Sequence, residues 1–138
     1  MTERFEILEH TADIGLQARA ATREELYEAL GEGLATMQGA WFPGEGTERP
    51  VRVESSDPEA LLVAWLDELL YLHESEDAVL TGLSVDSVDD TSLAARVRLD
   101  SRGDRELEGV GVKAATYHRV RVTQDPDGAW TGRIYLDV

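Results

Sequence analysis

Two acidic residues near opposite ends of this sequence could hold a metal ion. Asp13 lies in the segment EHTADIG (residues 9–15), and Asp137 is followed by Val138. Ca²⁺ and Mg²⁺ prefer oxygen ligands, and Mg²⁺ keeps several waters where a protein offers one or two carboxylates. We therefore expect Asp13, Asp137 and the terminal carboxylate of Val138 to bind one divalent cation, Ca²⁺ or Mg²⁺, provided that the two ends of the chain meet.

Lys113 and two histidines are further candidates for functional contacts. Lys113 is the only lysine among 13 basic residues, and it lies with His118 in the segment VKAATYH (residues 112–118). It could guard the carboxylates or contact a partner's phosphate, because an ammonium is a compact point charge with three donors. His10 and His118 could be general bases, metal ligands or partner contacts, although loop histidines more often hold the backbone by hydrogen bonds.

Each of these residues also has a purely structural interpretation. Aspartate between two strands commonly caps its own backbone, which would account for Asp13. Asp137 could be a solvated strand end, and Lys113 could be an ordinary surface residue. Sequence spacing alone favours the structural interpretations of Asp13 and Asp137, because two isolated aspartates stand among 28 acidic residues.

The motifs of common enzymes are absent from the sequence. It has no cysteine, no glycine-rich phosphate loop, no nucleophile elbow, no paired-histidine zinc motif and no dinucleotide fingerprint. We therefore expect no catalytic residues and a protein that is not a stand-alone enzyme. Neither a secretion signal nor an apolar stretch long enough to cross a membrane is present, so we expect a cytoplasmic protein without a membrane partner.

The charge of the chain constrains its partners. The formal net charge is −15, from 28 acidic and 13 basic side chains. Such a protein repels the phosphates of nucleic acids unless its basic groups cluster on one face, and they do not cluster in the sequence. Direct nucleic-acid binding is therefore disfavoured, and cations or basic proteins are favoured as partners. Adaptation to high salt would explain the same acidity.

The apolar pattern predicts the elements that would position these residues. Alternation in residues 5–7 and 14–20 predicts two strands that flank the turn at 10–13. A capping box at Thr22 begins a first helix. Asp57-Pro58 begins a second helix with a broad apolar face, as an N-cap followed by proline at the first helical position.

The remaining segments predict further strands and a fold class. Strands are expected around residues 51–53, 83–85 and 93–99, followed by a hairpin of residues 117–123 and 130–137. The resulting order ββαβαββββ indicates an α+β fold. The length and the 42% hydrophobic content fit one domain over residues 1–138. We expect a two-layer sandwich with both helices on one face of a mixed, largely antiparallel sheet.

Four segments of the sequence resemble the archease family of small acidic proteins. They are EHTADIG (residues 9–15), LLVAWLDELLYL (residues 61–72), VKAATYH (residues 112–118) and the aspartate at position 137. These segments occur in the family's order and span nearly the whole chain. Asp67, in the second of them, occupies a position that the family often fills with asparagine.

This resemblance implies an accessory protein of the RtcB-type RNA ligase in tRNA splicing and RNA repair. Such a protein promotes guanylylation of the ligase and multiple turnover, with a divalent metal bound by acidic residues. By the same resemblance, Asp13, Asp137 and Val138 are the metal ligands and Lys113 is a further functional contact. The alternative is a chaperone or specificity modulator of a tRNA-modifying enzyme such as a tRNA methyltransferase.

Overall fold

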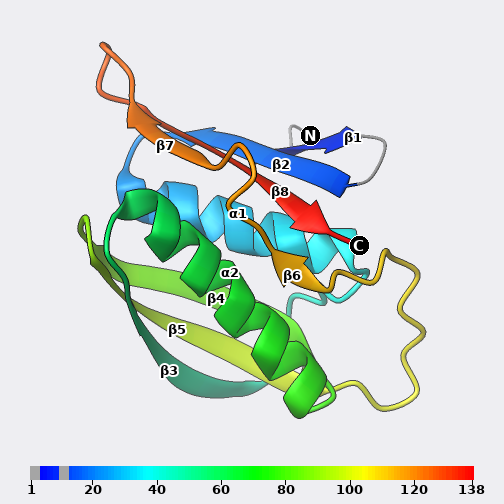
Figure 1. Ribbon diagram of the computed structural model, residues 1–138. Helices are drawn as coiled ribbons and strands as arrows, with labels where there is room; N and C mark the ends of the chain where they lie inside the picture. The colour runs from blue at the N-terminus through cyan, green and yellow to red at the C-terminus, as the bar shows by residue number, and fades with distance from the viewer. Residues whose placement is uncertain (1–3, 10–12) are drawn as a thin grey trace.

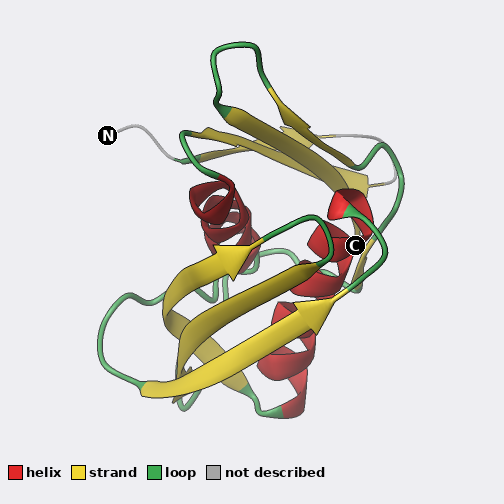
Figure 2. Ribbon diagram, turned by 90° about the vertical axis from the view of Figure 1, so that its left-hand side faces the viewer, coloured by secondary structure: helices red, strands yellow, loops and turns green. Residues whose placement is uncertain are grey.

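The strands of this protein form two sheets, and its two helices pack against both of them (Figures 1 and 2). The structure is a computed structural model that describes residues 4–9 and 13–138. The five-stranded sheet has the order β1-β2-β8-β6, with β7 also paired to β8, and the three-stranded sheet has the order β3-β5-β4. The strands are β1 (Phe5–Glu9), β2 (Asp13–Ala20), β3 (Thr47–Glu54), β4 (Ala78–Val88), β5 (Ser92–Ser101), β6 (Ala114–Ala115), β7 (Arg121–Gln124) and β8 (Trp130–Asp137).

Both helices begin at the residues that the sequence predicts. Helix α1 (Arg23–Met37) is capped by Thr22, whose hydroxyl oxygen accepts a hydrogen bond from the N–H of Glu25 at 3.2 Å. Helix α2 (Pro58–Ser75) is capped by Asp57, whose carboxylate accepts one from the N–H of Ala60 at 2.8 Å. Each cap satisfies an N–H group that has no partner inside the helix, so the two helix starts are fixed locally.

Helix α1 is buried on nearly all sides because it lies between the two sheets (Figure 2). Helix α2 packs beside it and contacts strands of both sheets. The indole N–H of Trp65, on α2, donates to the carbonyl oxygen of Tyr27, on α1, at 2.9 Å. The hydroxyl of Tyr27 in turn donates to the carbonyl oxygen of Pro58 at 2.9 Å. Two buried aromatic residues therefore hold the helices together, with both of their polar atoms paired.

The α+β class is confirmed, and in each sheet the named strands pair antiparallel with the helices on one face. The strands divide between two sheets, whereas the sequence pattern suggested one. The physical reason is the composition of α1, which is too apolar to be covered from one side. Its buried residues are Leu26, Tyr27, Ala29, Leu30, Gly31, Gly33, Leu34, Ala35 and Met37.

The predicted strand of residues 117–123 begins later than expected, at Arg121. Arg119 has a φ of 52°, in the left-handed region, which interrupts an extended chain. The segment before it forms the short strand β6, which the sequence pattern did not predict. No helix in the described part of the chain is long and apolar enough to cross a membrane.

Replacing Asp77 by glycine should stabilise the protein. Asp77 has a φ of 48° and follows the C-terminal cap of α2, a position where glycine is preferred and a negative charge opposes the helix dipole. We expect the free energy of unfolding in urea to rise by about 0.5–1 kcal/mol. Asp104→Gly, in an exposed loop without a positive φ, should give no gain. A loss of stability in Asp77→Gly would contradict this explanation.

Tyr27 should make the protein sensitive to alkaline pH. Burial raises the pKa of its phenol well above the ordinary value, because the ionised form would be a charge in the core. Above about pH 10 the unfolded chain releases this proton while the folded chain keeps it. The free energy of unfolding is therefore unaffected by Tyr27 below about pH 10 and falls as the pH rises further. In Tyr27→Phe, the free energy of unfolding should decrease less above that pH. The control Tyr71→Phe changes a residue that is 63% exposed, and it should retain the fall.

Candidate functional site

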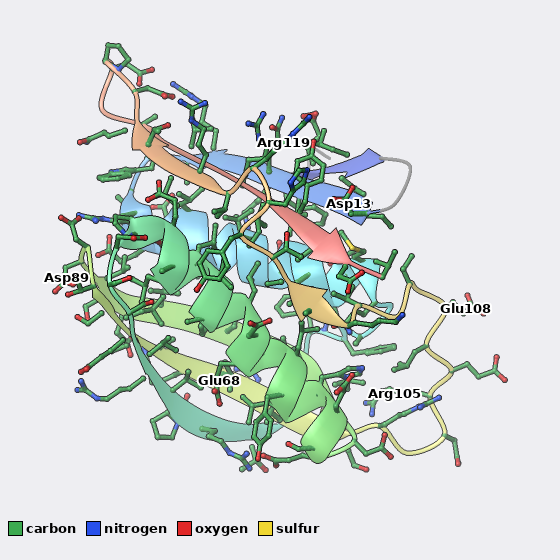
Figure 3. The ribbon with its side chains drawn as sticks, viewed as in Figure 1. Asp13, Glu68, Asp89, Arg105, Glu108 and Arg119 are labelled. Atoms are coloured by element: carbon green, nitrogen blue, oxygen red, sulfur yellow. The ribbon has the colours of Figure 1, made fainter. Side chains whose placement is uncertain are left out.

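The two predicted acidic ligands lie opposite each other on neighbouring strands. Asp13 opens β2, Asp137 ends β8, and the two are direct register partners in the antiparallel pair. Residues so paired point to the same face of a sheet, with Cβ atoms about 4.5–5.5 Å apart. Asp13 is partly buried and Asp137 is exposed. Figure 3 shows Asp13 beside the end of β8, so Asp13 and Asp137 lie next to each other as the metal hypothesis requires.

Lys113 is brought to the same place by a third strand. Ala114, on β6, is also a register partner of Asp137. The N–H of Lys113 donates to the carbonyl oxygen of Asp137 at 2.7 Å, which fixes the lysine backbone beside the acidic pair. The side chain of Lys113 is exposed. The Lys113 side chain is therefore accessible from solvent.

Strand β6 has only two residues, and helix α2 provides an additional anchor for it. The carboxylate of Asp67 accepts a hydrogen bond from the N–H of Ala115 at 2.9 Å. This contact joins the exposed side of α2 to the strand that carries Lys113 towards the site. Asp67 thus has a positioning role, in a place where an asparagine carbonyl oxygen could accept the same hydrogen bond.

His118 packs against an aromatic ring and does not join the two carboxylates. Its ring meets that of Tyr135 edge-on, with centroids 5.7 Å apart, and the guanidinium carbon of Arg119 lies 5.9 Å from the Tyr135 centroid. Tyr135 faces Gly15 across the sheet, and a Cβ atom on Gly15 would lie 2.9 Å from the tyrosine ring. His10, the other predicted contact, lies outside the described residues.

The acidic pair fits a hard cation by charge and by donor type. Like charges placed directly opposite each other on a sheet are destabilising, and a bound cation would offset this repulsion. Within residues 4–9 and 13–138, no group of three or more His, Cys, Asp or Glu side chains could hold a metal ion. A cation held by Asp13 and Asp137 would therefore need further ligands, which a backbone oxygen of Val138 and waters could supply, as Mg²⁺ is often held.

Three residues that shape the site were not identified from the sequence: Gly15, Asp67 and Tyr135. A signal for two of them exists, because side chains alternate along a strand. Gly15 is two residues from Asp13 and Tyr135 is two residues from Asp137, so both share the face of the acidic pair. Asp67 gave no comparable signal, since its partner is a backbone group distant in the sequence.

Removing the Asp67 carboxylate should loosen β6. Asp67→Ala leaves the N–H of Ala115 without its acceptor, and we expect the free energy of unfolding to fall by about 0.5–1.5 kcal/mol. Hydrogen exchange of the Ala115 amide should become faster. Asp67→Asn, which keeps an acceptor oxygen, should restore most of the protection. Unchanged exchange in Asp67→Ala would contradict the anchoring role.

Comparisons with known proteins agree over almost the full chain. A family model for the archease protein family matches residues 5–138. The chain is 36% identical to Protein archease of Thermococcus gammatolerans, over 98% of this chain and 99% of that one. It is 33% identical to Protein archease of Methanosarcina barkeri, over 99% and 97% of the two chains.

Solved structures show the same fold. The solution structure of protein 1598 of Methanobacterium thermoautotrophicum has a TM-score of 0.76 and 28% identity, covering 99% of this chain and all of that one. The crystal structure of an archease from Thermotoga maritima, described as a possible chaperone, has a TM-score of 0.65 and 20% identity over 96% of each chain. Together with the family model and the curated relatives, these matches show that the chain belongs to the archease family.

Proposed function

We propose that this protein is an accessory protein of an RtcB-type RNA ligase in tRNA splicing and RNA repair. In this role it promotes guanylylation of the ligase and multiple turnover, and it carries out no reaction by itself. Membership of the archease family and the four motif segments of the sequence support this assignment. The observation that carries it is the register pairing of Asp13 with Asp137.

The paired carboxylates would hold one divalent cation at the rim of the five-stranded sheet. Asp13, Asp137 and a backbone oxygen of Val138 are the residues that would bind it. The ion would supply positive charge that offsets phosphate charge where the ligase reacts with GTP. Because both aspartates belong to hydrogen-bonded strands, their backbones are positioned before a partner binds, which lowers the ordering cost of association.

The charge of the protein suits a basic partner. A net charge of −15 would accelerate docking to the positively charged surface of an RNA-binding enzyme. Lys113, exposed and held beside the acidic pair, could then contact a phosphate or a carboxylate of that enzyme.

A second candidate function is a chaperone or specificity modulator of a tRNA methyltransferase. It is favoured by the description of the Thermotoga maritima archease as a possible chaperone. In that role the protein would bind its client without an ion. The two functions therefore differ in their response to a chelator.

The metal role is tested by removing each carboxylate. Asp13→Ala and Asp137→Ala should retain the fold, with a change in unfolding free energy within about 0.5 kcal/mol because repulsion between the carboxylates is relieved. Both should lose binding of Ca²⁺ or Mg²⁺ in calorimetry and should no longer accelerate ligase guanylylation with radiolabelled GTP. Asp104→Ala removes the same charge from an exposed loop and should behave as wild type.

Full stimulation of the ligase by both site variants would refute the metal role. If a chelator abolishes stimulation by wild-type protein, an ion is required. If the protein alters a methyltransferase instead, with or without a chelator, the second function is the correct one.

A further inference from the structure

Three arginines that are separated in the sequence share one face of the five-stranded sheet. Arg121, on β7, and Arg133, on β8, are direct register partners and therefore point to the same side. This side faces away from the helices, because the adjacent residue Ile134 is fully buried against the core. Arg119 lies over the Tyr135 ring on the same side (Figure 3). We call Arg119, Arg121 and Arg133 the arginine face.

The arginine face lacks the carboxylate partners that most other arginines of this chain have. Among the residues that the structure describes, no carboxylate forms an ion pair with Arg119, Arg121 or Arg133, and the buried Nε of Arg133 has no hydrogen-bond acceptor. Six other arginines do pair with carboxylates, namely Arg4, Arg19, Arg23, Arg49, Arg96 and Arg105. The outer side of the sheet does carry carboxylates, including Asp137 at the end of β8, but none of them pairs with these three arginines.

Two like charges in direct register also lower stability, because they repel each other across the strand pair. The neighbour of Arg133 on the other side is Gln17, on β2, and the amide of Gln17 donates to Glu6 on β1 at 3.5 Å. Glu6 is therefore two strands away from Arg133, roughly 10 Å. An anion from outside the molecule would relieve the repulsion between Arg121 and Arg133.

The surroundings of the arginine face contain aromatic rings. The Tyr135 ring lies next to Arg133 along the outer side of β8, and Arg119 covers part of it. Tyr117 lies in the turn that leads to Arg119, and it is 66% exposed. No helix covers this side of the sheet (Figure 2). An open sheet surface with arginines, next to a loop that carries an exposed aromatic ring, resembles the platforms that bind single-stranded nucleic acid.

We infer that the arginine face binds the phosphate groups of single-stranded RNA, with a base stacked on the exposed ring of Tyr117. A guanidinium group is planar and donates two parallel hydrogen bonds, a geometry that matches phosphate oxygens. The acidity of the remaining surface restricts binding to the few nucleotides that contact this face. The basic groups do not cluster in the sequence, but the fold brings three of them to one face. RNA binding there is independent of the proposed role with the ligase.

The metal site could reinforce this binding. Asp137 is four residues from Arg133 on the same side of β8, a separation of roughly 13 Å. A divalent cation held there would cancel negative charge at the end of the arginine face. RNA that contacts the arginines would then be repelled less by the acidic pair.

The inference is tested with a fluorescein-labelled uridine oligonucleotide and the full chain, by anisotropy at low ionic strength. Wild-type protein should bind, and the affinity should fall as salt rises. Arg121→Ala should weaken binding by about tenfold. It should also reduce the slope of log affinity against log salt by about 0.7, the change expected for one lost phosphate contact. Tyr117→Ala should weaken binding without changing that slope.

Arg52→Ala is the matched control. Arg52 is an exposed arginine on β3, in the three-stranded sheet and away from the arginine face. Because each variant loses one arginine, Arg52→Ala and Arg121→Ala have the same net charge. It should bind RNA as wild type does. Arg133→Gln provides a second variant of the arginine face should Arg121→Ala fail to fold in thermal unfolding.

Three results would overturn the inference: no RNA binding by wild-type protein at low ionic strength, equal weakening by Arg52→Ala and Arg121→Ala, or displacement of the RNA by poly-glutamate at an equal concentration of charge. The last result would assign the arginine face to an acidic protein segment. Because the assay contains no ligase, a failure of the inference is distinct from a failure of the proposed function.

Discussion

The pairing of β2 with β8 is the constraint on which the rest of the site depends. One register sets Asp13 against Asp137, Gly15 against Tyr135 and Gln17 against Arg133. A shift of one residue would turn every one of these side chains to the opposite face. The buried face prevents such a shift, because Leu16 and Ile134 are fully buried as register partners. Packing in the core thereby determines which side chains meet on the outer surface.

Helix α2 extends this control to the two short strands at the edge of the sheet. Its Asp67 accepts the N–H of Ala115 on β6, and its Glu59 accepts the N–H of Val122 on β7 at 3.0 Å. Two short strands have few ladder hydrogen bonds of their own, so these carboxylates add to the restraint on their positions. Part of the acidity of the protein is therefore structural, and the high-salt interpretation of the net charge does not account for these residues.

Local patterns were sufficient to predict much of this fold. The caps at Thr22 and Asp57, the apolar faces of both helices and the strands around Asp13 and Asp137 follow from short-range rules. The division into two sheets did not follow, because it depends on how many sides of α1 must be covered. The short strand β6 was also missed, since a carboxylate of helix α2 helps to hold it. The turn at Arg119 was missed because it depends on a left-handed backbone conformation at a residue other than glycine.

Strand β8 comes last along the described chain, yet it lies in the interior of its sheet, between β2 on one side and β6 and β7 on the other. During synthesis the earlier strands therefore lack their central partner until β8 has left the ribosome. Contacts between segments so distant in sequence form late and slowly. A nascent chain would consequently have neither the acidic pair nor the paired arginines of β7 and β8 until β8 has joined the sheet.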